Sequence, residues 1–300
     1  MINQLPEEEY FAQGHRACAG CGSVLAIRHV LKAAGKNTII AQATGCMEVI
    51  STPYPETSWK LPWIHVLFEN AAAVASGIEV ALKKLNKKDV NVLAIAGDGG
   101  TFDIGLQALS GAIERCHKFC YVCIDNEAYM NTGVQRSGAT PMFASTTTSP
   151  AGKAVPGKLQ PKKPLPFIIA AHGLRYVATA SCANPIDIYN KVKKALSING
   201  PSFIQIFTPC PIGWKHASEL TIDIARLAIK TCVTPIYEIE NGVLKLNKID
   251  NKMPVEEYLK LQGRFKHLTK ELISQTQRYV DERYKFLSEN DGKKLFDVLY

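Results

Sequence analysis

Two short apolar runs, each ending at polar residues, constrain the fold of this chain most strongly. Residues 90–96 are almost continuously apolar and rich in β-branched side chains, which is typical of a strand buried on both faces of a parallel sheet. The run ends abruptly at Gly-Asp-Gly-Gly over 97–100. A second run of the same kind, 119–124, is followed by Asp-Asn-Glu over 125–127. The pattern predicts an α/β fold in which helices flank a mostly parallel sheet.

The polar residues after these runs have the chemistry of a site for a diphosphate and a divalent metal. Glycines let the backbone approach a phosphate closely, and Asp98 supplies one hard oxygen ligand. Asn126 lies far enough along the chain for a crossover helix and a second strand to intervene. Helical spacing over 103–115, with Thr101 or Asp103 as N-cap, supplies that crossover. Because ligands of open α/β sheets bind at the carboxyl ends of strands, we expect Asp98 and Asn126 to lie together. A glycine turn beside an exposed aspartate is the simpler alternative.

Four of the nine cysteines stand out by their surroundings. Cys18 and Cys21 form a glycine-flanked Cys-x-x-Cys, whereas Cys46 and Cys210 each follow an apolar run. Four thiolates from a loop and from strand ends suit an iron–sulfur cluster or a structural zinc, and their spacing does not separate these two. No signal-like segment opens the chain, so we expect a reducing, cytoplasmic compartment and no disulfide framework.

Three other cysteines have the spacing of a radical S-adenosylmethionine motif, namely Cys116, Cys120 and Cys123. That motif needs a flexible loop, whereas Cys120 and Cys123 fall within a predicted strand. Residues three apart in a strand point to opposite faces of the sheet, so they are poorly placed to share a cluster. We predict that these three cysteines, with Cys182 and Cys232, act as small hydrophobic residues in or near the core.

Six motifs together resemble the β subunits of the multi-subunit pyruvate:ferredoxin oxidoreductases, also called pyruvate synthases. They are CAGCG at 18–22, TGCMEVISTPYPETSW at 44–59, PWIHVLFENAAAVASG at 62–77, GDGGTFDIG at 97–105, DNEAYMNTGVQRSGATP at 125–141 and TPCPIGW at 208–214. The resemblance covers roughly residues 10–245 and does not depend on the tail. It implies the thiamine-diphosphate-binding fold.

The resemblance also implies a cofactor site. Asp98, Asn126 and the carbonyl of Ala128 match the ligands of a Mg²⁺ ion that bridges the two phosphates of thiamine diphosphate. Asn131 matches the residue that faces the reacting carbon and the substrate, which makes it the candidate catalytic residue. Ser23 matches a position that contacts the cofactor, although members of the family often carry Glu there. The full set of implied cofactor-binding residues is Ser23, Cys46, Gly97, Asp98, Gly99, Gly100, Asn126, Ala128, Tyr129, Met130 and Asn131.

In the same family, the positions of Cys18, Cys21, Cys46 and Cys210 hold the 4Fe-4S cluster nearest to the thiamine. A zinc would have no use beside a thiamine site, whereas a cluster accepts electrons from it, so we favour the cluster. The implied reaction is the reversible oxidative decarboxylation of pyruvate with coenzyme A to acetyl-CoA and CO₂, with electrons passing from thiamine diphosphate through the cluster to ferredoxin.

The resemblance implies partner subunits as well. In the family, the carboxylate that contacts the aminopyrimidine of the cofactor comes from the α subunit, and γ and δ subunits or fused equivalents complete the complex. Glu69 is the only motif-embedded candidate in this chain, and an acid at the start of a helix is the plainer interpretation of it. We therefore expect the chain to be inactive alone.

Three alternatives stay open at this stage. The same machinery could act on oxalate, 2-oxoisovalerate or 2-oxoglutarate. An electron-transfer or iron-sensing module that lost thiamine is the second, and the presence of Asp98, Asn126 and Asn131 argues against it. A thiamine carboligase without iron is the third, and the four cysteines argue against that. His15 and His65 lie in or beside the motifs, and each is at least as well explained by a structural role as by a catalytic one.

The rest of the chain predicts one domain over 1–245 and a polar, helical C-terminal arm over 246–300 that packs on this subunit or a neighbour. Residues 131–165 are rich in Gly, Pro, Ser, Thr and Lys, which indicates a long loop. It either covers the cofactor and contacts the α subunit or is a mobile surface excursion. Strands are predicted at 38–43, 90–96, 119–124, 175–180 and 202–207, and helices at 22–34, 70–85, 103–115, 185–198 and 218–230.

A formal net charge of +8 does not indicate a nucleic-acid-binding protein, because the lysines are dispersed and no aromatic platform accompanies them. A solvated surface is the plain interpretation, and attraction of an acidic electron carrier or of the coenzyme A phosphates is the functional one. No apolar run is long enough to suggest membrane insertion.

Overall fold

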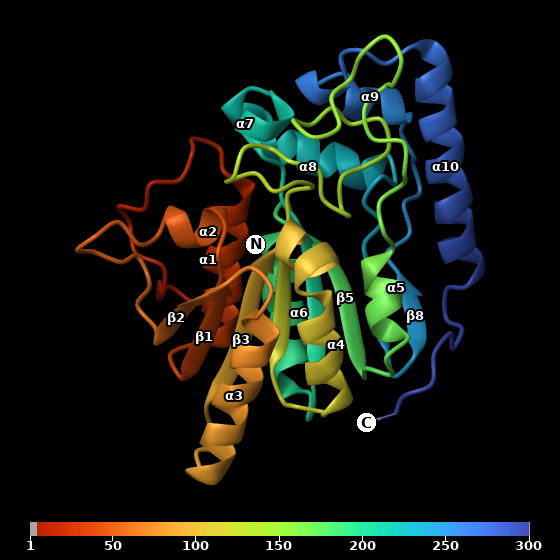
Figure 1. Cartoon of the computed structure of the whole chain (residues 1–300). Helices are drawn as coiled ribbons and strands as arrows, with labels where there is room; N and C mark the ends of the chain where they lie inside the picture. Colours follow the sequence, from red (N-terminus) through yellow and green to blue (C-terminus); the bar gives the residue numbers. More distant parts are fainter. Residues whose placement is uncertain (1–4, 300) are drawn as a thin grey trace.

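The chain forms an eight-stranded sheet with helices on both faces, as a computed structural model shows for residues 5–299 (Figure 1). Residues 1–4 and 300, the ends of the predicted domain and arm, lie outside the described part. In order along the chain, the strands are β1 (Thr38–Ala43), β2 (Trp63–Val66), β3 (Asn91–Gly97), β4 (Cys120–Asp125), β5 (Tyr176–Ser181), β6 (Ser202–Phe207), β7 (Tyr237–Glu240) and β8 (Val243–Leu246). Their order across the sheet is β2-β1-β3-β4-β6-β5-β7-β8.

Helices connect most of these strands. The α-helices are α1 (Gly22–Ala34), α2 (Cys46–Val49), α3 (Ala71–Lys84), α4 (Leu106–Glu114), α5 (Leu165–Ala170), α6 (Pro185–Ser197), α7 (Pro211–Trp214), α8 (Thr221–Lys230), α9 (Val255–Leu259) and α10 (Lys270–Glu289). A π-helical turn, η2 (Gly100–Ile104), and two 3₁₀ turns, η3 (Ser218–Leu220) and η4 (Gly263–Phe265), complete the set in the described residues.

The mostly parallel α/β prediction is confirmed. The six strands from β2 to β5 in the sheet order are parallel, and only β7 and β8 pair antiparallel. All five predicted strands are present, each within one residue at both ends. Strands β4, β5 and β6 are buried along their whole length, because helices cover both faces.

Alternate residues of the central strands contribute to two separate hydrophobic clusters. Ala94 and Ala96 of β3 pack with α3, α4 and α5 on the face seen in front in Figure 1. Leu93 and Ile95 pack with α1 and α6 on the other face. Cys120 belongs to the second cluster and Cys123 to the first, so the two cysteines of β4 point to opposite faces as predicted.

The crossover helix after β3 begins later than predicted. The chain first makes the π-turn η2, and α4 then starts after Gly105 with no side-chain cap. Thr101 is not the N-cap, because its Oγ1 donates back to the carbonyl of Gly97 at 2.7 Å. Asp103 is not the cap either, since it accepts from the backbone N–H of Gly138 at 2.8 Å.

The sequence pattern did not reveal the shorter elements. Strands β2, β7 and β8 are four residues each, too short for a clear period, and two of the four residues of β2 are exposed. In contrast, helix α6 begins as predicted, with Asn184 Oδ1 accepting from the N–H of Asp187 at 3.1 Å. It ends at Ser197, just before the predicted stop.

The C-terminal segment packs on this chain. Its residues Val255, Tyr258 and Val280 share a third hydrophobic cluster with Phe207 and Trp214. The predicted boundary at 245 falls within β8, and the division into a domain and an arm remains a prediction. No helix in residues 5–299 is long and apolar enough to cross a bilayer.

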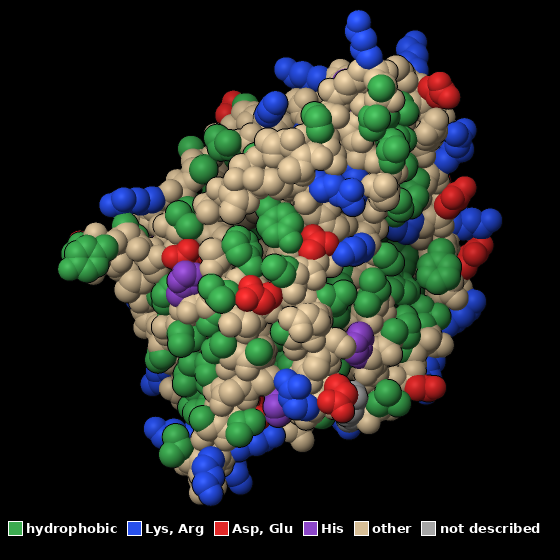
Figure 2. Space-filling view, in the orientation of Figure 1, with side chains coloured by type: hydrophobic (Ala, Val, Ile, Leu, Met, Phe, Trp, Pro, Cys, Tyr) green, Lys and Arg blue, Asp and Glu red, His purple; other side chains and the backbone are tan. Residues whose placement is uncertain are grey.

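Residues 126–164 contain no helix or paired strand of the sheet, so the predicted long loop is confirmed. In Figure 1 this loop passes over the carboxyl ends of the strands. Figure 2 shows basic side chains scattered around the same view of the molecule, with acidic ones among them and no continuous basic stripe.

Candidate active site

The candidate site lies where neighbouring strands β3 and β4 end. The two strands pair in parallel up to Gly97 and Ile124, so Asp98 and Asn126 emerge side by side at one edge of the sheet. Both side chains are buried. The backbone N–H of Asn126 donates to Asp98 Oδ1 at 3.2 Å, which joins the two strand ends directly.

Three polar atoms converge just beyond this hydrogen bond. The side-chain amide of Asn126 faces Asp98 Oδ1 and the carbonyl oxygen of Ala128, and its NH₂ group on that side donates to both at 2.9 Å. Turning the amide would place its oxygen at the same position. Adjacent oxygens around an octahedral Mg²⁺ ion are about 3 Å apart, because each lies about 2.1 Å from the metal. With the Asn126 oxygen turned toward the other two atoms, the spacing and the all-oxygen donor set fit a magnesium ion.

The electrostatics of Asp98 agree with a cation at this position. Burial, together with the nearby carboxylate of Asp125, raises the pKa of Asp98 well above its usual range. Ser137 Oγ donates to Asp98 Oδ2 at 2.5 Å and opposes that rise only in part. A divalent cation would stabilise the charged carboxylate that burial disfavours.

Two glycines of the 97–100 turn are required by packing inside the protein. A Cβ added at Gly99 would lie 2.3 Å from the ring of Tyr129, and one at Gly100 would lie 2.8 Å from the carbonyl oxygen of Phe68. The Tyr129 hydroxyl also donates to the carbonyl of Gly99 at 2.8 Å. A Cβ at Gly97 would meet no atom within 4 Å, so space is open on that side of the turn.

A small cavity of about 40 Å³ gathers most of the predicted cofactor residues. It is lined by Thr44, Gly45, Cys46, Phe68, Gly97, Asp98, Gly99, Gly100, Asn126, Ala128, Tyr129, Met130, Asn131 and Thr132. Pockets that enclose a cofactor-sized ligand are usually about 300–1,000 Å³. This cavity is smaller than such a pocket.

Comparison with known proteins identifies the family. The sequence family described as "Thiamine pyrophosphate enzyme, C-terminal TPP binding domain" matches residues 43–206, which include this cavity. The pyruvate synthase subunit PorB of Methanocaldococcus jannaschii is 57% identical, over 96% of this chain and 99% of its own length. The chain belongs to the PorB family of thiamine pyrophosphate enzymes. It is thus an oxidoreductase subunit with a thiamine-diphosphate-binding domain, and the resemblance read from the motifs is confirmed.

Other relatives place the PorB family within a wider group. The ketoisovalerate oxidoreductase subunit VorB of Pyrococcus abyssi is 49% identical, over 98% of this chain and 96% of its own. A solved 2-oxoglutarate:ferredoxin oxidoreductase from Magnetococcus marinus has a TM-score of 0.58 at 21% identity, covering 74% of this chain and 82% of that one. That structure supports the fold, and the sequence relatives are named as subunits of a pyruvate synthase and of a ketoisovalerate oxidoreductase.

Asn131 and Ser23, both predicted to contact the cofactor, lie in different places relative to the small cavity. Asn131 lines the cavity, as expected. Ser23 does not, because it lies buried in the first turn of α1 with its Oγ 3.2 Å from Thr208 Oγ1. Thr44, Gly45, Phe68 and Thr132 also line the cavity and were not predicted, although all four belong to motifs that the sequence had singled out.

The four candidate cluster cysteines, Cys18, Cys21, Cys46 and Cys210, lie near one another. Burial, together with the neighbouring Cys210, Cys21 and Cys18, raises the pKa of Cys46 to about 12, so the four thiols lie within electrostatic range of one another. Backbone N–H groups approach two of the sulfurs, with Gly213 donating to Cys210 Sγ at 3.4 Å. Within residues 5–299, no group of three or more His, Cys, Asp or Glu side chains is packed tightly enough to hold a single metal ion.

The remaining candidates have local partners. His65 Nε2 lies 2.7 Å from Thr44 Oγ1, and His15 Nδ1 accepts from the N–H of Ala17 at 3.4 Å. Glu69 immediately precedes Asn70, the residue at the N-cap position of helix α3. None of the three lines the small cavity.

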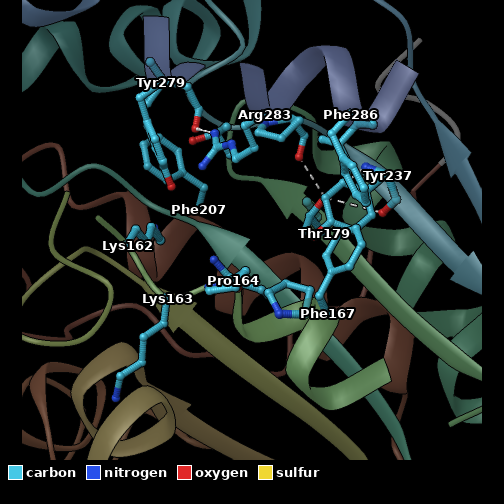
Figure 3. A pocket seen from close by; sticks show the side chains of 17 residues that line it. Lys162, Lys163, Pro164, Phe167, Thr179, Phe207, Tyr237, Tyr279, Arg283 and Phe286 are labelled. Atoms are coloured by element: carbon cyan, nitrogen blue, oxygen red, sulfur yellow. Dashed lines mark hydrogen bonds between the residues drawn. The ribbon is translucent and has the colours of Figure 1, made fainter. Parts of the chain in front are cut away.

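A larger cavity of about 240 Å³ lies between α5, α10 and the ends of β5 and β6 (Figure 3). Phe167, Tyr237 and Phe286 form part of its apolar wall. It shares no lining residue with the small cavity. Lys162 lines the larger cavity while its ammonium pairs with Asp125 and Glu127, so this side chain separates the larger cavity from the polar turn after β4.

Proposed function

We propose that this chain is the β subunit of a pyruvate:ferredoxin oxidoreductase. The reaction is the reversible conversion of pyruvate and coenzyme A to acetyl-CoA and CO₂, with electrons passing to a 4Fe-4S cluster and on to ferredoxin. The observation that carries the proposal is the convergence of Asp98 Oδ1, the Asn126 side chain and the Ala128 carbonyl at 2.9 Å spacings. That oxygen set lies in the same cavity as Cys46, which joins the metal site to the cysteine group.

In this proposal Asp98, Asn126 and Ala128 hold Mg²⁺, and the open space at Gly97 receives the diphosphate. The cofactor supplies the carbon nucleophile and electron sink that decarboxylation of a 2-oxoacid needs. Asn131, at the mouth of the same cavity, hydrogen-bonds and orients the substrate. Cys18, Cys21, Cys46 and Cys210 lie close enough to influence one another electrostatically, which supports a cluster. The sulfurs that hold a four-iron cluster are spread more widely than the roughly 4 Å between sulfurs on one zinc ion, and no group of the described residues is compact enough for a single metal ion.

A partner α subunit completes the site. The small cavity is too small for the whole cofactor, and large apolar side chains near its lining residues are exposed. Ile64, Leu67 and Ile104 are 47%, 61% and 51% exposed. Exposed apolar side chains close together are typical of an interface. We expect the α subunit to cover them and to supply the carboxylate against the aminopyrimidine, with the 131–165 loop at the contact and γ and δ subunits or fused equivalents in the full complex.

The choice of acid is the second part of the proposal. Relatives named pyruvate synthase are up to 57% identical, whereas the ketoisovalerate relative is 49% identical, which favours pyruvate. 2-Oxoisovalerate is the alternative that this relative supports.

The experiment is an anaerobic purification of the chain with its native partners. Iron, acid-labile sulfide and thiamine diphosphate are counted, and ferredoxin reduction is then followed with coenzyme A and either pyruvate or 2-oxoisovalerate. We expect about four iron and four sulfide assignable to this chain, one thiamine diphosphate, and a higher kcat/KM for pyruvate. Thiamine without iron would contradict the cluster, and a higher kcat/KM for 2-oxoisovalerate would contradict pyruvate as substrate.

A further inference from the structure

The turn that follows β4 offers only one of its carbonyl groups to the metal site. The carbonyl of Asp125 accepts from the N–H of Thr208 at 2.8 Å, and that of Asn126 accepts from Trp214 Nε1 at 2.8 Å. The carbonyl of Glu127 accepts from Thr140 Oγ1 at 2.6 Å. The next carbonyl, that of Ala128, is the one that faces the Asp98 and Asn126 side chains.

Glu127 is the residue at which the backbone turns. Its φ is +68°, in the left-handed region that residues other than glycine seldom adopt. Such a conformation persists when the surroundings determine it. Its side chain is buried, and its two carboxylate oxygens have separate cationic partners. Oε1 lies 2.9 Å from Lys162 Nζ, and Oε2 lies 2.7 Å from Arg264 Nη2.

Those two cations come from distant parts of the chain. Lys162 lies near the end of the long loop and also forms an ion pair with Asp125. Arg264 lies in η4 of the C-terminal segment, 137 residues from Glu127. Its guanidinium also stacks 3.7 Å above the ring of Trp214, the same residue that holds the Asn126 carbonyl. Arg264 therefore contacts the turn on both sides, through Glu127 and through Trp214.

We propose that Arg264 and Lys162 are positioning residues for the magnesium site, acting through Glu127 to hold the Ala128 carbonyl and the Asn126 side chain toward Asp98. The inference rests on the magnesium site of the proposed function and adds residues outside the motifs to it. Arg264 and the Glu127 carboxylate are buried, and the Lys162 side chain is 15% exposed, so the loss of either cation would leave a buried carboxylate with one partner fewer and would allow the turn to relax.

The test compares variants of the complete complex, stripped of cofactor under anaerobic conditions. Thiamine diphosphate retention is measured as Mg²⁺ is titrated, which gives a half-saturating Mg²⁺ concentration independent of turnover. Arg264→Gln should raise that concentration by about 10–100-fold, the usual effect of losing a group that orients a metal ligand. Arg264→Lys should raise the half-saturating Mg²⁺ concentration less than Arg264→Gln does. Lysine keeps the positive charge, but it lacks the planar guanidinium that forms two hydrogen bonds and stacks on Trp214.

Two controls distinguish positioning from general destabilisation. Lys191→Gln removes the ion pair that buried Lys191 makes with Asp187 at 2.8 Å within helix α6, and it should leave the Mg²⁺ requirement unchanged. In a Glu127→Gln background, Arg264→Gln should add little, since the two residues act in one chain of contacts.

The outcomes separate this inference from the proposed function. A wild-type complex that retains thiamine diphosphate equally with and without Mg²⁺ would contradict the magnesium site itself. A magnesium-dependent wild type whose Arg264→Gln variant has an unchanged requirement, or one raised equally by Lys191→Gln, would overturn the positioning role alone.

Discussion

The backbone N–H of Asn126 donates a hydrogen bond to Asp98 Oδ1, 28 residues earlier in the chain, at 3.2 Å. The hydrogen bond joins the ends of two parallel strands and brings the Asn126 side chain next to the same carboxylate. Because both residues are buried, the two proposed metal ligands are already positioned by the protein. A cation that binds there has little chain to order, which favours tight binding.

Asp98→Ala should abolish thiamine diphosphate retention while leaving iron in place, because Asp98 is the charged ligand of the proposed magnesium site and the cysteines are a separate donor set. The measurement is thiamine diphosphate and iron per complex, purified without oxygen. An equal loss of both would mean that the two sites are not separable.

Cys46→Ala should remove most of the iron assigned to this chain, since three remaining thiolates hold a four-iron cluster weakly. The matched control is Cys182→Ala. Cys182 is fully buried, and its Sγ lies against the start of α1, where a Cβ added at Gly22 would meet it at 3.3 Å. Iron analysis and the electron paramagnetic resonance signal of the reduced complex should change only in the Cys46 variant. Iron loss in both would point to a folding defect.

Gly99→Ala should destabilise the protein by about 1–3 kcal/mol, the usual cost of forcing an extra carbon into a packed site. The new methyl would lie 2.3 Å from the Tyr129 ring, so the ring and its cavity-lining neighbours would have to move. Gly77→Ala is the control, because a Cβ there meets nothing within 4 Å in the middle of helix α3. It should stabilise the protein by about 0.5–1 kcal/mol. Thermal unfolding of both variants checks the prediction, and equal shifts would contradict it.

His29 should make the protein less stable in mild acid. Burial, with Arg28 and Lys32 nearby, lowers the pKa of His29 from 6.5 to about 4. A depressed folded-state pKa means that the neutral ring contributes its full stability above pH 6.5. That stability is lost as the pH falls from 6.5 toward 4, because the unfolded chain takes up the proton first.

His29→Phe should therefore reduce the fall in unfolding free energy between pH 7 and pH 4.5 by on the order of 2 kcal/mol. Urea unfolding at the two pH values measures this difference directly, and the comparison within each protein cancels any packing cost of the substitution. A fall as large in the variant as in the wild type would show that His29 is not the group responsible.

Local patterns were sufficient for much of this protein. The apolar runs predicted β1, β3, β4, β5 and β6, because a strand buried on both faces needs such a run. The period of two residues predicted that Cys120 and Cys123 would point apart, and they do. The Gly-Asp-Gly turn and the later Asn predicted which strand ends would meet. Each of these inferences depends on local periodicity or on short motifs.

Other features were decided only by tertiary structure. The π-turn η2 delays the start of helix α4. Neither Thr101 nor Asp103 is free to cap the helix, because Thr101 Oγ1 donates to the carbonyl of Gly97 and the Asp103 carboxylate accepts from the N–H of Gly138 in the long loop. Strands β7 and β8 form by pairing against β5 and each other, a contact that four residues alone do not predict. The cavity excludes Ser23 because Thr208 holds it in the α1 interface.

The sequence by itself determined the fold class, the family and the chemical types of the site residues, since these follow from local periodicity and short motifs. Only the tertiary structure decided how Glu127 is held in a left-handed turn by Lys162 and Arg264. A buried carboxylate needs cations, and no local rule states from which distant segment they will come. That choice depends on how the long loop and the C-terminal segment fold back over the sheet edge.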